Sequence, residues 1–390
     1  MPKKDARNML LAWLFLSLFV LSGCMPSATP QKKQPPTFFP PAPSLPRYQF
    51  LRSFNGSADF AKKATGLAAF IGVRGRKGFV FKKPYGVAMR NGILYVCDSM
   101  NTVFTFNFAK QKFAPLSGAQ GMGKLVEPLN IALDKKGNKY VADPVRSQVL
   151  KYDKHDFFVK SYSNPDEWKP VAVAVYGSNL FVVDGTHNKG RVQVFDIKTG
   201  SVIDSIGNSG EENTRLRIPV DIAFDQEGYM YVVDMGRFQV VKYDRDGHYR
   251  GYLGSAGSSF GHFGRPKGIA IDHDGRIYVA DAAFNNVQVF AANGQVLTAF
   301  GSLPLDKPGS MNLPAGVAIN YDSVDYFKKY AAPGFKIQYL IIVANQFHPY
   351  RAINVYGFGR MTGKTYPSDQ ELLDKYMREM RRKGKGRAAE

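Results

Sequence analysis

The stretch from Pro266 to Phe290 reads PKGIAIDHDGRIYVADAAFNNVQVF and contains three short apolar segments separated by turns. GIAID is followed by the turn sequence HDGR, IYVAD ends on an aspartate, and VQVF follows five residues later. Short runs of β-branched and aromatic residues, bounded by Asp, Gly and Asn, indicate β-strands joined by tight turns. The stretch therefore predicts an antiparallel unit of at least three strands.

The same pattern occurs six times along the chain. Each copy has a proline, an apolar segment, a second apolar segment that ends in Asp or Asn, and a third segment of the type VQVF. The prolines are Pro84, Pro128, Pro170, Pro219, Pro266 and Pro314, and the closing residues are Asp98, Asp143, Asp184, Asp234, Asp281 and Asn345. Successive prolines are 42 to 49 residues apart. A repeat of this length with short strands is typical of a β-propeller, so six blades are expected.

The repeated unit resembles the NHL repeat family, whose consensus is close to the stretch 266–290. The resemblance covers about Arg47 to Gly359 and implies an all-β, six-bladed β-propeller of NHL-type repeats. The segment RYQFLRSFN, from Arg47 to Asn55, resembles the fourth strand of a blade. Because the pattern stops after Tyr356, we expect this N-terminal strand to complete the sixth blade and to close the ring.

Composition and charge agree with a folded protein that meets anionic surroundings. The chain has 390 residues, of which 44% are hydrophobic and 22% charged, which excludes a disordered chain. Aromatic residues make up 13%, and 38 Gly and 23 Pro supply many turns. The formal net charge is +20. Nucleic acid, phospholipid, acidic glycans and acidic proteins are the partners that such a charge favours.

The N-terminus has the pattern of an export signal. Basic residues precede the apolar run from Met9 to Leu21, and LSGC follows at 21–24. LSGC resembles the bacterial lipobox, which implies cleavage before Cys24 and acylation of that cysteine. An exported lipoprotein is not expected to bind nucleic acid. By the same resemblance, Met25 in place of Asp favours the outer membrane; the alternative is an uncleaved membrane anchor.

Four segments are therefore expected along the chain. Residues 1–23 form a lipoprotein signal peptide, and 24–46 form a proline-rich tether behind the lipidated Cys24. Residues 47–359 form the propeller, and 360–390 form a helix and a basic tail. The helix is expected over Ser368–Lys383, because Ser368 and Glu371 form a capping box and apolar residues recur at helical spacing. The basic run within Gly56–Lys83 is expected at the surface of the ring.

One ring of residues is a candidate binding site. It consists of the residues three positions after each closing Asp or Asn, which the family resemblance places at one mouth of the propeller: Asn101, Arg146, His187, Arg237, Phe284 and His348. Arginines and histidines around a funnel suit an anionic group or an acidic side chain. The alternative is that they are turn residues that hydrogen-bond to neighbouring loops.

Catalytic machinery is not evident. Of six histidines, only His187 and His348 fall at equivalent blade positions, and a catalytic zinc usually needs three protein ligands. Cys97 replaces Ala or Val of the other repeats, which indicates a small core residue. Asp221 is the main carboxylate of the innermost strands, which argues against a carboxylate-rich calcium site. We expect no cofactor and no bound metal.

These observations favour a binding protein over an enzyme. We expect an extracytoplasmic scaffold, held to the membrane by its lipid anchor, whose face loops bind a protein or peptide partner in the cell envelope. Anionic lipid or glycan is a further partner class that the charge allows. Similar lipoproteins occur beside envelope assemblies such as multihaem cytochrome complexes, so a role in such a complex is an extension of the resemblance. The alternative is a metal-dependent lyase or hydrolase at the His187/His348 mouth.

Overall fold

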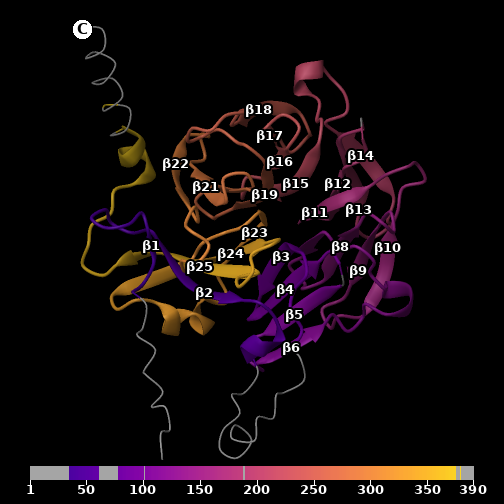
Figure 1. The fold of residues 1–390 in the computed structure, drawn as a ribbon. Coiled ribbons are helices and arrows are strands. Elements are labelled where there is room, and N and C mark those ends of the chain that lie inside the picture. Colours follow the sequence, from indigo (N-terminus) through magenta and orange to yellow (C-terminus); the bar gives the residue numbers. More distant parts are fainter. Residues whose placement is uncertain (1–34, 61–77, 101, 188, 375–377, 379–390) are drawn as a thin grey trace, which may run out of the picture. The chain divides into compact units, whose positions relative to one another are not determined.

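Six antiparallel sheets surround a central axis in the computed structural model, which describes residues 35–60, 78–100, 102–187, 189–374 and 378 (Figure 1). All six sheets belong to the compact unit Pro36–Glu390. In five sheets the innermost strand starts at the repeated proline, and in blade 2 it starts two residues after Pro128; the other strands of each sheet lie successively farther out. The fold is therefore the expected all-β, six-bladed β-propeller.

Blades 1 to 3 each have four strands. Blade 1 contains β3 (Pro84–Arg90), β4 (Ile93–Asp98), β5 (Val103–Asn107) and β6 (Lys112–Pro115). Blade 2 contains β7 (Asn130–Leu133), β8 (Lys139–Asp143), β9 (Gln148–Tyr152) and β10 (Phe158–Tyr162). Blade 3 contains β11 (Pro170–Tyr176), β12 (Asn179–Asp184), β13 (Arg191–Asp196) and β14 (Val202–Ile206).

Blades 4 to 6 complete the ring. Blade 4 contains β15 (Pro219–Phe224), β16 (Met230–Asp234), β17 (Gln239–Tyr243) and β18 (Tyr249–Leu253). Blade 5 contains β19 (Pro266–Ile271), β20 (Ile277–Asp281), β21 (Asn286–Phe290) and β22 (Val296–Phe300). Blade 6 contains β23 (Pro314–Asn320), β24 (Phe335–Asn345), β25 (Ile353–Met361), β2 (Tyr48–Phe54) and β1 (Phe38–Phe39). Short 3-10 turns are η2 (Ser57–Phe60), η3 (Gly121–Gly123), η4 (Glu212–Thr214), η5 (Val324–Tyr326) and η6 (Lys328–Tyr330).

The hydrophobic core lies between the blades. Each of six clusters of buried side chains draws its residues from two neighbouring sheets. Cys97 belongs to the cluster between blades 1 and 2 and is fully buried, as expected for a small core residue. Because side chains alternate across each strand, one blade contributes to the clusters on both of its faces.

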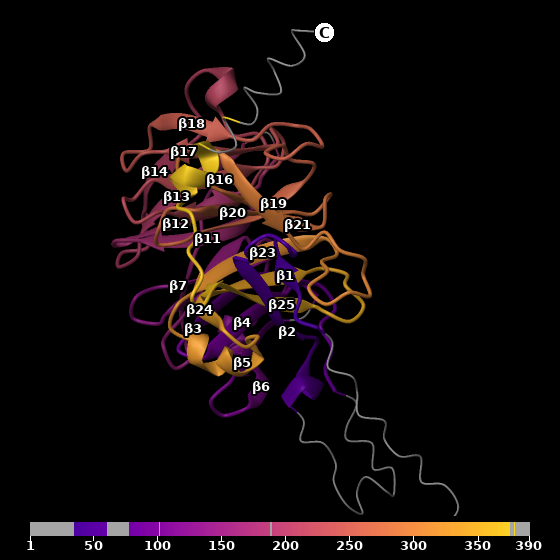
Figure 2. The same cartoon turned by 90° about the vertical axis from the view of Figure 1, so that its left-hand side faces the viewer.

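Blade 6 closes the ring with the N-terminal strand. β2 pairs antiparallel with β25, from Tyr48 opposite Phe358 to Phe54 opposite Ile353. The indigo β2 therefore lies beside the yellow β25 although the two are about 300 residues apart (Figure 1 and Figure 2). This pairing confirms the expected closure and covers the backbone edge of β25.

The folded blade begins earlier than the expected boundary at Arg47. β1 adds a fifth strand, with Phe38 opposite Gln49 and Phe39 opposite Tyr48. The ring of Phe39 is buried, with its centre 6.1 Å from that of Phe300 and 6.2 Å from that of Tyr356. Residues 38–46 are therefore part of the blade, because Phe39 enters the core between blades 5 and 6, and not part of a proline-rich tether.

The C-terminal helix spans 369–374 in the described residues. Its capping box forms as expected, because the Ser368 backbone N–H donates to Glu371 Oε2 at 2.7 Å and the Glu371 N–H donates to Ser368 Oγ at 3.2 Å. Asp369 pairs with Arg276 of blade 5 at 2.6 Å, which ties the helix to the propeller. The expected continuation towards Lys383 lies outside the described residues apart from residue 378.

Most of the basic segment within Gly56–Lys83 also lies outside the described residues. Its described ends form a single bridge between Gly56 and Val80. In the part of the chain that the structure covers, no helix has both the length and the apolar character needed to cross a bilayer.

The buried position of Phe39 predicts that β1 stabilises the closed ring. Replacing Phe39 by Ala in the full chain is expected to lower the free energy of unfolding by about 3 kcal/mol, because it empties a filled site in the core. Phe157 is 64% exposed, so Phe157→Ala is the matched control and is expected to change the value by less than about 0.5 kcal/mol. Equal values for the two variants, measured by urea unfolding, would show that β1 does not contribute.

Candidate functional site

One face of the propeller is shaped by the six residues that close the second strands. We call it the Asp face; it consists of the turns between second and third strands together with the loops that join one blade to the next. Asp98, Asp143, Asp184, Asp234 and Asp281 are fully buried, and Asn345 is nearly so. Each of the five aspartates accepts hydrogen bonds from both parts of this face.

Blade 5 shows the arrangement. The carboxylate of Asp281 accepts the backbone N–H groups of Ala283 at 2.9 Å and Phe284 at 3.3 Å, in the turn that follows it. It also accepts those of Gly264 at 2.8 Å and Arg265 at 3.0 Å, in the loop that enters the blade. A carboxylate without protons offers four lone-pair sites, which suits four donors. The aspartate therefore fixes the turn, as expected, and also holds the incoming loop.

Blade 6 uses an amide for the same purpose. Asn345 Oδ1 accepts the Asn312 N–H at 3.4 Å, and its Nδ2 donates to the carbonyl of Arg351 at 3.0 Å. The turn after Asn345 is longer and places a carbonyl, not a further N–H, beside the side chain. An amide fits this position because it carries both a donor and an acceptor.

Two arginines of the expected ring bind neighbouring loops. Arg146 donates to the carbonyls of Met122, at 3.1 Å, and Lys124. Arg237 donates to the carbonyls of Arg215, at 2.7 Å, and Glu212. Both side chains thus strengthen the loop that enters their own blade, which is the alternative role that the sequence allowed.

His348 also holds a loop. Its Nε2 bonds to Ser310 Oγ at 3.0 Å, and its Nδ1 accepts the Tyr350 N–H at 3.2 Å. Burial, with a contribution from the nearby Arg351 charge, lowers the pKa of His348 to about 4. With both ring nitrogens engaged in this way, the side chain is poorly suited to ligate a metal.

The remaining predicted site residues differ in how exposed they are, and two of them are not described. His187 is exposed, and Phe284 is half-buried close to Gly264. Asn101 and Cys24 lie outside the described residues. All the ring positions that are described lie in the turns of the Asp face, but their side chains do not converge on one ligand. Their role in partner binding stays a prediction.

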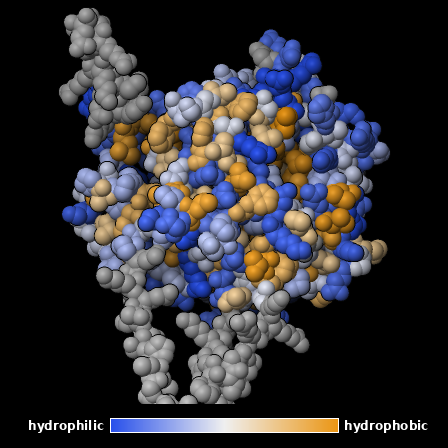
Figure 3. All heavy atoms as spheres, in the orientation of Figure 1, coloured by the Kyte–Doolittle hydropathy of each residue, from blue (hydrophilic) through white to orange (hydrophobic). Residues whose placement is uncertain are grey.

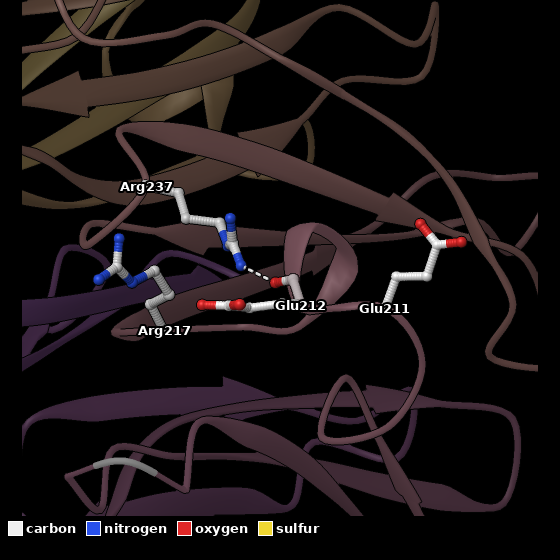
Figure 4. Close-up of a pocket in the computed structure, with 4 residues that line it drawn as sticks. All are labelled: Glu211, Glu212, Arg217 and Arg237. Carbon is white, nitrogen blue, oxygen red and sulfur yellow. Dashed lines mark hydrogen bonds between the residues drawn. The ribbon is translucent and has the colours of Figure 1, made fainter.

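A shallow pocket lies beside Arg237 of the ring. Its volume is about 440 Å³, and Glu211, Glu212, Arg217 and Arg237 line it. Figure 4 shows the Arg237 guanidinium hydrogen-bonded to the Glu212 backbone, whereas the Glu212 carboxylate extends towards Arg217. Two cations and two anions face one space, so the pocket has no strong preference for one sign of charge.

Exposed apolar side chains gather on the Asp face at positions that the ring did not include. Figure 3 shows apolar residues among hydrophilic ones on the viewed face of the propeller. The residues two positions after the closing Asp or Asn are Met100 in blade 1, Val145 in blade 2 and Phe347 in blade 6, and they are 60%, 60% and 53% exposed. Blades 6, 1 and 2 are consecutive around the ring. We call these three residues the apolar arc.

The apolar arc can be recognised in the sequence two positions after each closing Asp or Asn, whereas the predicted ring considered only the third position. Blades 3, 4 and 5 carry Thr186, Gly236 and Ala283 at the same +2 position. Large apolar residues in turns of three neighbouring blades are not needed for the core, because the structure leaves them exposed. Their exposure in the turns of three neighbouring blades makes them candidates for a binding surface.

Near the central axis, below the Asp face, the buried carboxylate of Asp221 accepts hydrogen bonds from other blades. Asp221 accepts Asn130 Nδ2 of blade 2 at 3.0 Å, the Ile269 N–H of blade 5 at 2.9 Å and the N–H of Ile222 at 2.9 Å. Burial raises the pKa of Asp221 to about 7, against the opposing effect of these donors. Both oxygens of this carboxylate accept hydrogen bonds from N–H groups, so Asp221 links blades 2, 4 and 5. With its oxygens occupied in this way, the carboxylate is poorly placed to bind a cation.

Comparisons with known proteins agree with this architecture. The family model described as the NHL repeat matches residues 263–290. Protein brain tumor of Drosophila melanogaster is 30% identical over 135 residues, which cover 34% of this chain and 12% of the Drosophila protein. The matched segment is thus a small part of that relative.

Two solved structures resemble most of the ring. A protein of unknown function from Bacteroides thetaiotaomicron superposes with a TM-score of 0.56 at 19% identity, and covers 78% of this chain and 75% of its own. A gluconolactonase from Xanthomonas campestris has a TM-score of 0.52 at 14% identity, with coverage of 71% and 86%. At this identity the likeness shows the fold alone. The six sheets make this chain a six-bladed β-propeller, and residues 263–290, in its fifth blade, match the NHL repeat.

The setting of His348 predicts a pH-dependent contribution to stability. Its pKa is lowered in the fold, so the unfolded chain takes up a proton between pH 6.5 and about 4 while the folded chain does not. This contribution to stability is therefore present above pH 6.5 and is lost as the pH falls towards 4, with a slope of at most about 1.4 kcal/mol per pH unit.

Urea unfolding of the full chain at pH 4.5, 5.5 and 6.5 measures this slope. His348→Gln is expected to flatten it, whereas His187→Gln, which alters an exposed residue, is expected to leave it unchanged. Identical slopes for the wild type and His348→Gln would contradict the assigned role.

Proposed function

We propose that this protein is a lipid-anchored binding protein of the cell envelope that uses the Asp face to hold a protein or peptide partner. The apolar arc is the observation that carries the proposal. Methionine and aromatic side chains exposed on rigid turns are typical of protein interfaces, in which they supply most of the buried apolar area. The net charge of +20 favours a partner with acidic residues around its apolar contact.

The rigidity of the Asp face supports binding further. Its turns and loops are held by buried carboxylates, so the arc residues do not need to be ordered when a partner binds. Preorganised surfaces bind more tightly because less conformational entropy is lost on association. The proposed binding function extends to a role as a scaffold within a larger envelope complex, such as a multihaem cytochrome complex.

Membrane attachment through Cys24 is part of the same proposal. The order of basic residues, apolar run and lipobox-like LSGC supports it. Two or three acyl chains give stable anchoring. An outer-membrane location brings the propeller to envelope partners and keeps it away from nucleic acid.

A charge introduced into the apolar arc is expected to abolish partner binding. Met100→Asp with Phe347→Asp places two carboxylates in the proposed interface, and the amount of partner crosslinked in the native envelope is expected to fall at least about tenfold, since buried unpaired charges cost several kcal/mol. Quantitative mass spectrometry of the crosslinked partner measures it.

The control is Val202→Asp with Ile203→Asp. These residues are 40% and 54% exposed and lie at the start of β14, the outermost strand of blade 3, next to the turn that follows β13. The control is expected to keep partner recovery within twofold of the wild type. Unchanged recovery in the arc variant would contradict the proposed interface.

Replacing Cys24 by Ser tests the anchor. Without a thiol no thioether to diacylglycerol forms, so the variant is expected to leave the membrane fraction or to remain an uncleaved precursor. Fractionation followed by mass measurement distinguishes these outcomes from normal processing. A variant that is cleaved before residue 24 and still membrane-bound would rule out lipidation at Cys24.

A further inference from the structure

A buried lysine lies near the axis on the Asp-face side of the ring. Lys267 follows Pro266 at the start of β19, and its side chain is only 7% exposed. Its ammonium donates to Gln346 Oε1 at 2.6 Å and lies 5.1 Å from the centre of the Tyr85 ring. The three residues come from blades 5, 6 and 1, so three consecutive blades meet at this ammonium.

The backbone closes the space on the far side of these residues. Glycines occupy the second position after the proline in blades 5, 6 and 1. A Cβ on Gly268 would lie 2.0 Å from the carbonyl oxygen of Ala315, and one on Gly316 would lie 2.5 Å from that of Tyr85. The inner strands therefore approach closely through their backbones, and Lys267, which precedes Gly268 at the start of β19, lies on the Asp-face side of this contact.

The charge of Lys267 is not balanced by its neighbours. No carboxylate oxygen of the described residues lies within 4.0 Å of the ammonium. Burial, with contributions from the charges of Arg265 and Lys83, lowers the pKa of Lys267 to about 8. Glu127 and Asp221 act on Tyr85, where burial raises the pKa to about 12, but Asp221 is already bonded to three N–H groups. A buried ammonium without an anion is unfavourable unless a ligand supplies one.

One further donor group lies beside the ammonium. The amide nitrogen of Gln346 has no acceptor among the described residues, although the oxygen of the same amide bonds to Lys267. The Tyr85 ring covers another side of the ammonium, with its centre 5.1 Å away. One cation with a neighbouring amide donor matches a single carboxylate, which carries one negative charge and accepts several hydrogen bonds.

We propose that Lys267, Gln346 and Tyr85 form a carboxylate-binding site at the axis, which receives an acidic side chain of the partner held on the Asp face. The identity of this ligand group rests on the proposed function. The partner then presents an aspartate or glutamate beside the apolar residues that contact the arc. Arg265, which is exposed beside the site, adds to the positive potential that guides this group inward.

Lys267→Met in the full chain removes the charge but keeps most of the buried stem. The amount of partner crosslinked in the native envelope is expected to fall at least about tenfold. The matched control is Lys242→Met, because Lys242 also contacts an aromatic ring, Tyr229, at 4.0 Å but lies in β17 of blade 4. It is expected to keep recovery within twofold. Unchanged thermal unfolding of both variants shows that any loss does not come from misfolding.

A small probe tests the chemistry without the partner. N-acetylglutamate α-amide carries one carboxylate, and N-acetylglutamine α-amide is its uncharged match. Calorimetry with the full chain is expected to detect only the acidic probe, with affinity at least tenfold lower at pH 9.5 than at pH 6.5, because Lys267 loses its proton above pH 8. Lys267→Met is expected to abolish this binding.

The outcomes separate the site from the proposed function. Normal crosslinking by Lys267→Met, together with loss in the arc variant and no probe binding, overturns the carboxylate site and leaves the Asp face as the interface. If the acidic probe binds only when Lys267 is present, but Lys267→Met still crosslinks its partner normally, then the partner does not supply the carboxylate. The site then binds a free carboxylate. If the arc variant keeps its partner, the proposed interface fails and the probe alone decides the site.

Discussion

Hydrogen bonds to buried carboxylates fix the loops that connect one blade to the next. Neighbouring blades pack mainly through side chains, with close backbone contacts only at the inner strands, so the loops that join them are not ordered by a sheet. In blade 4, Asp234 accepts the N–H groups of Arg217 and Ile218 from the incoming loop and those of Gly236 and Arg237 from its own turn. A fully buried acceptor with four donors is costly to disrupt. The Asp face is therefore rigid although it consists almost entirely of turns.

This rigidity connects the fold to binding. Because the backbone of each turn is fixed at the closing Asp or Asn, the residue two positions later projects outward, and Met100, Val145 and Phe347 stay exposed. The residue three positions later turns towards the incoming loop, as Arg146 and Arg237 do. Near the axis, the approach of glycine-bearing strands brings Lys267 into contact with Gln346. The repeat thus places these positions alike in every blade, whereas the residues that fill them differ between blades.

The repeat made the fold predictable, whereas the site depended on details that no repeat encodes. Six prolines and six closing Asp or Asn residues predicted the blades, and RYQFLRSFN predicted the closing strand correctly. Phe39 was missed because a two-residue strand among prolines has no periodicity. The ring positions were identified by alignment, but the direction of the Arg146 and His348 side chains follows from loop conformation. The exposure of Phe347, and the lack of a carboxylate beside Lys267 among the described residues, depend on how the six blades assemble.

The most direct test of this account is the stability of Asp281→Ala. The substitution leaves four backbone N–H groups without their acceptor. The free energy of unfolding in urea is expected to fall by about 3 kcal/mol or more, with faster amide exchange at Gly264 and Arg265. Asp325→Ala removes a carboxylate that is 82% exposed and is expected to change stability by less than about 0.5 kcal/mol. Equal stability of the two variants would contradict the central role of the buried aspartates.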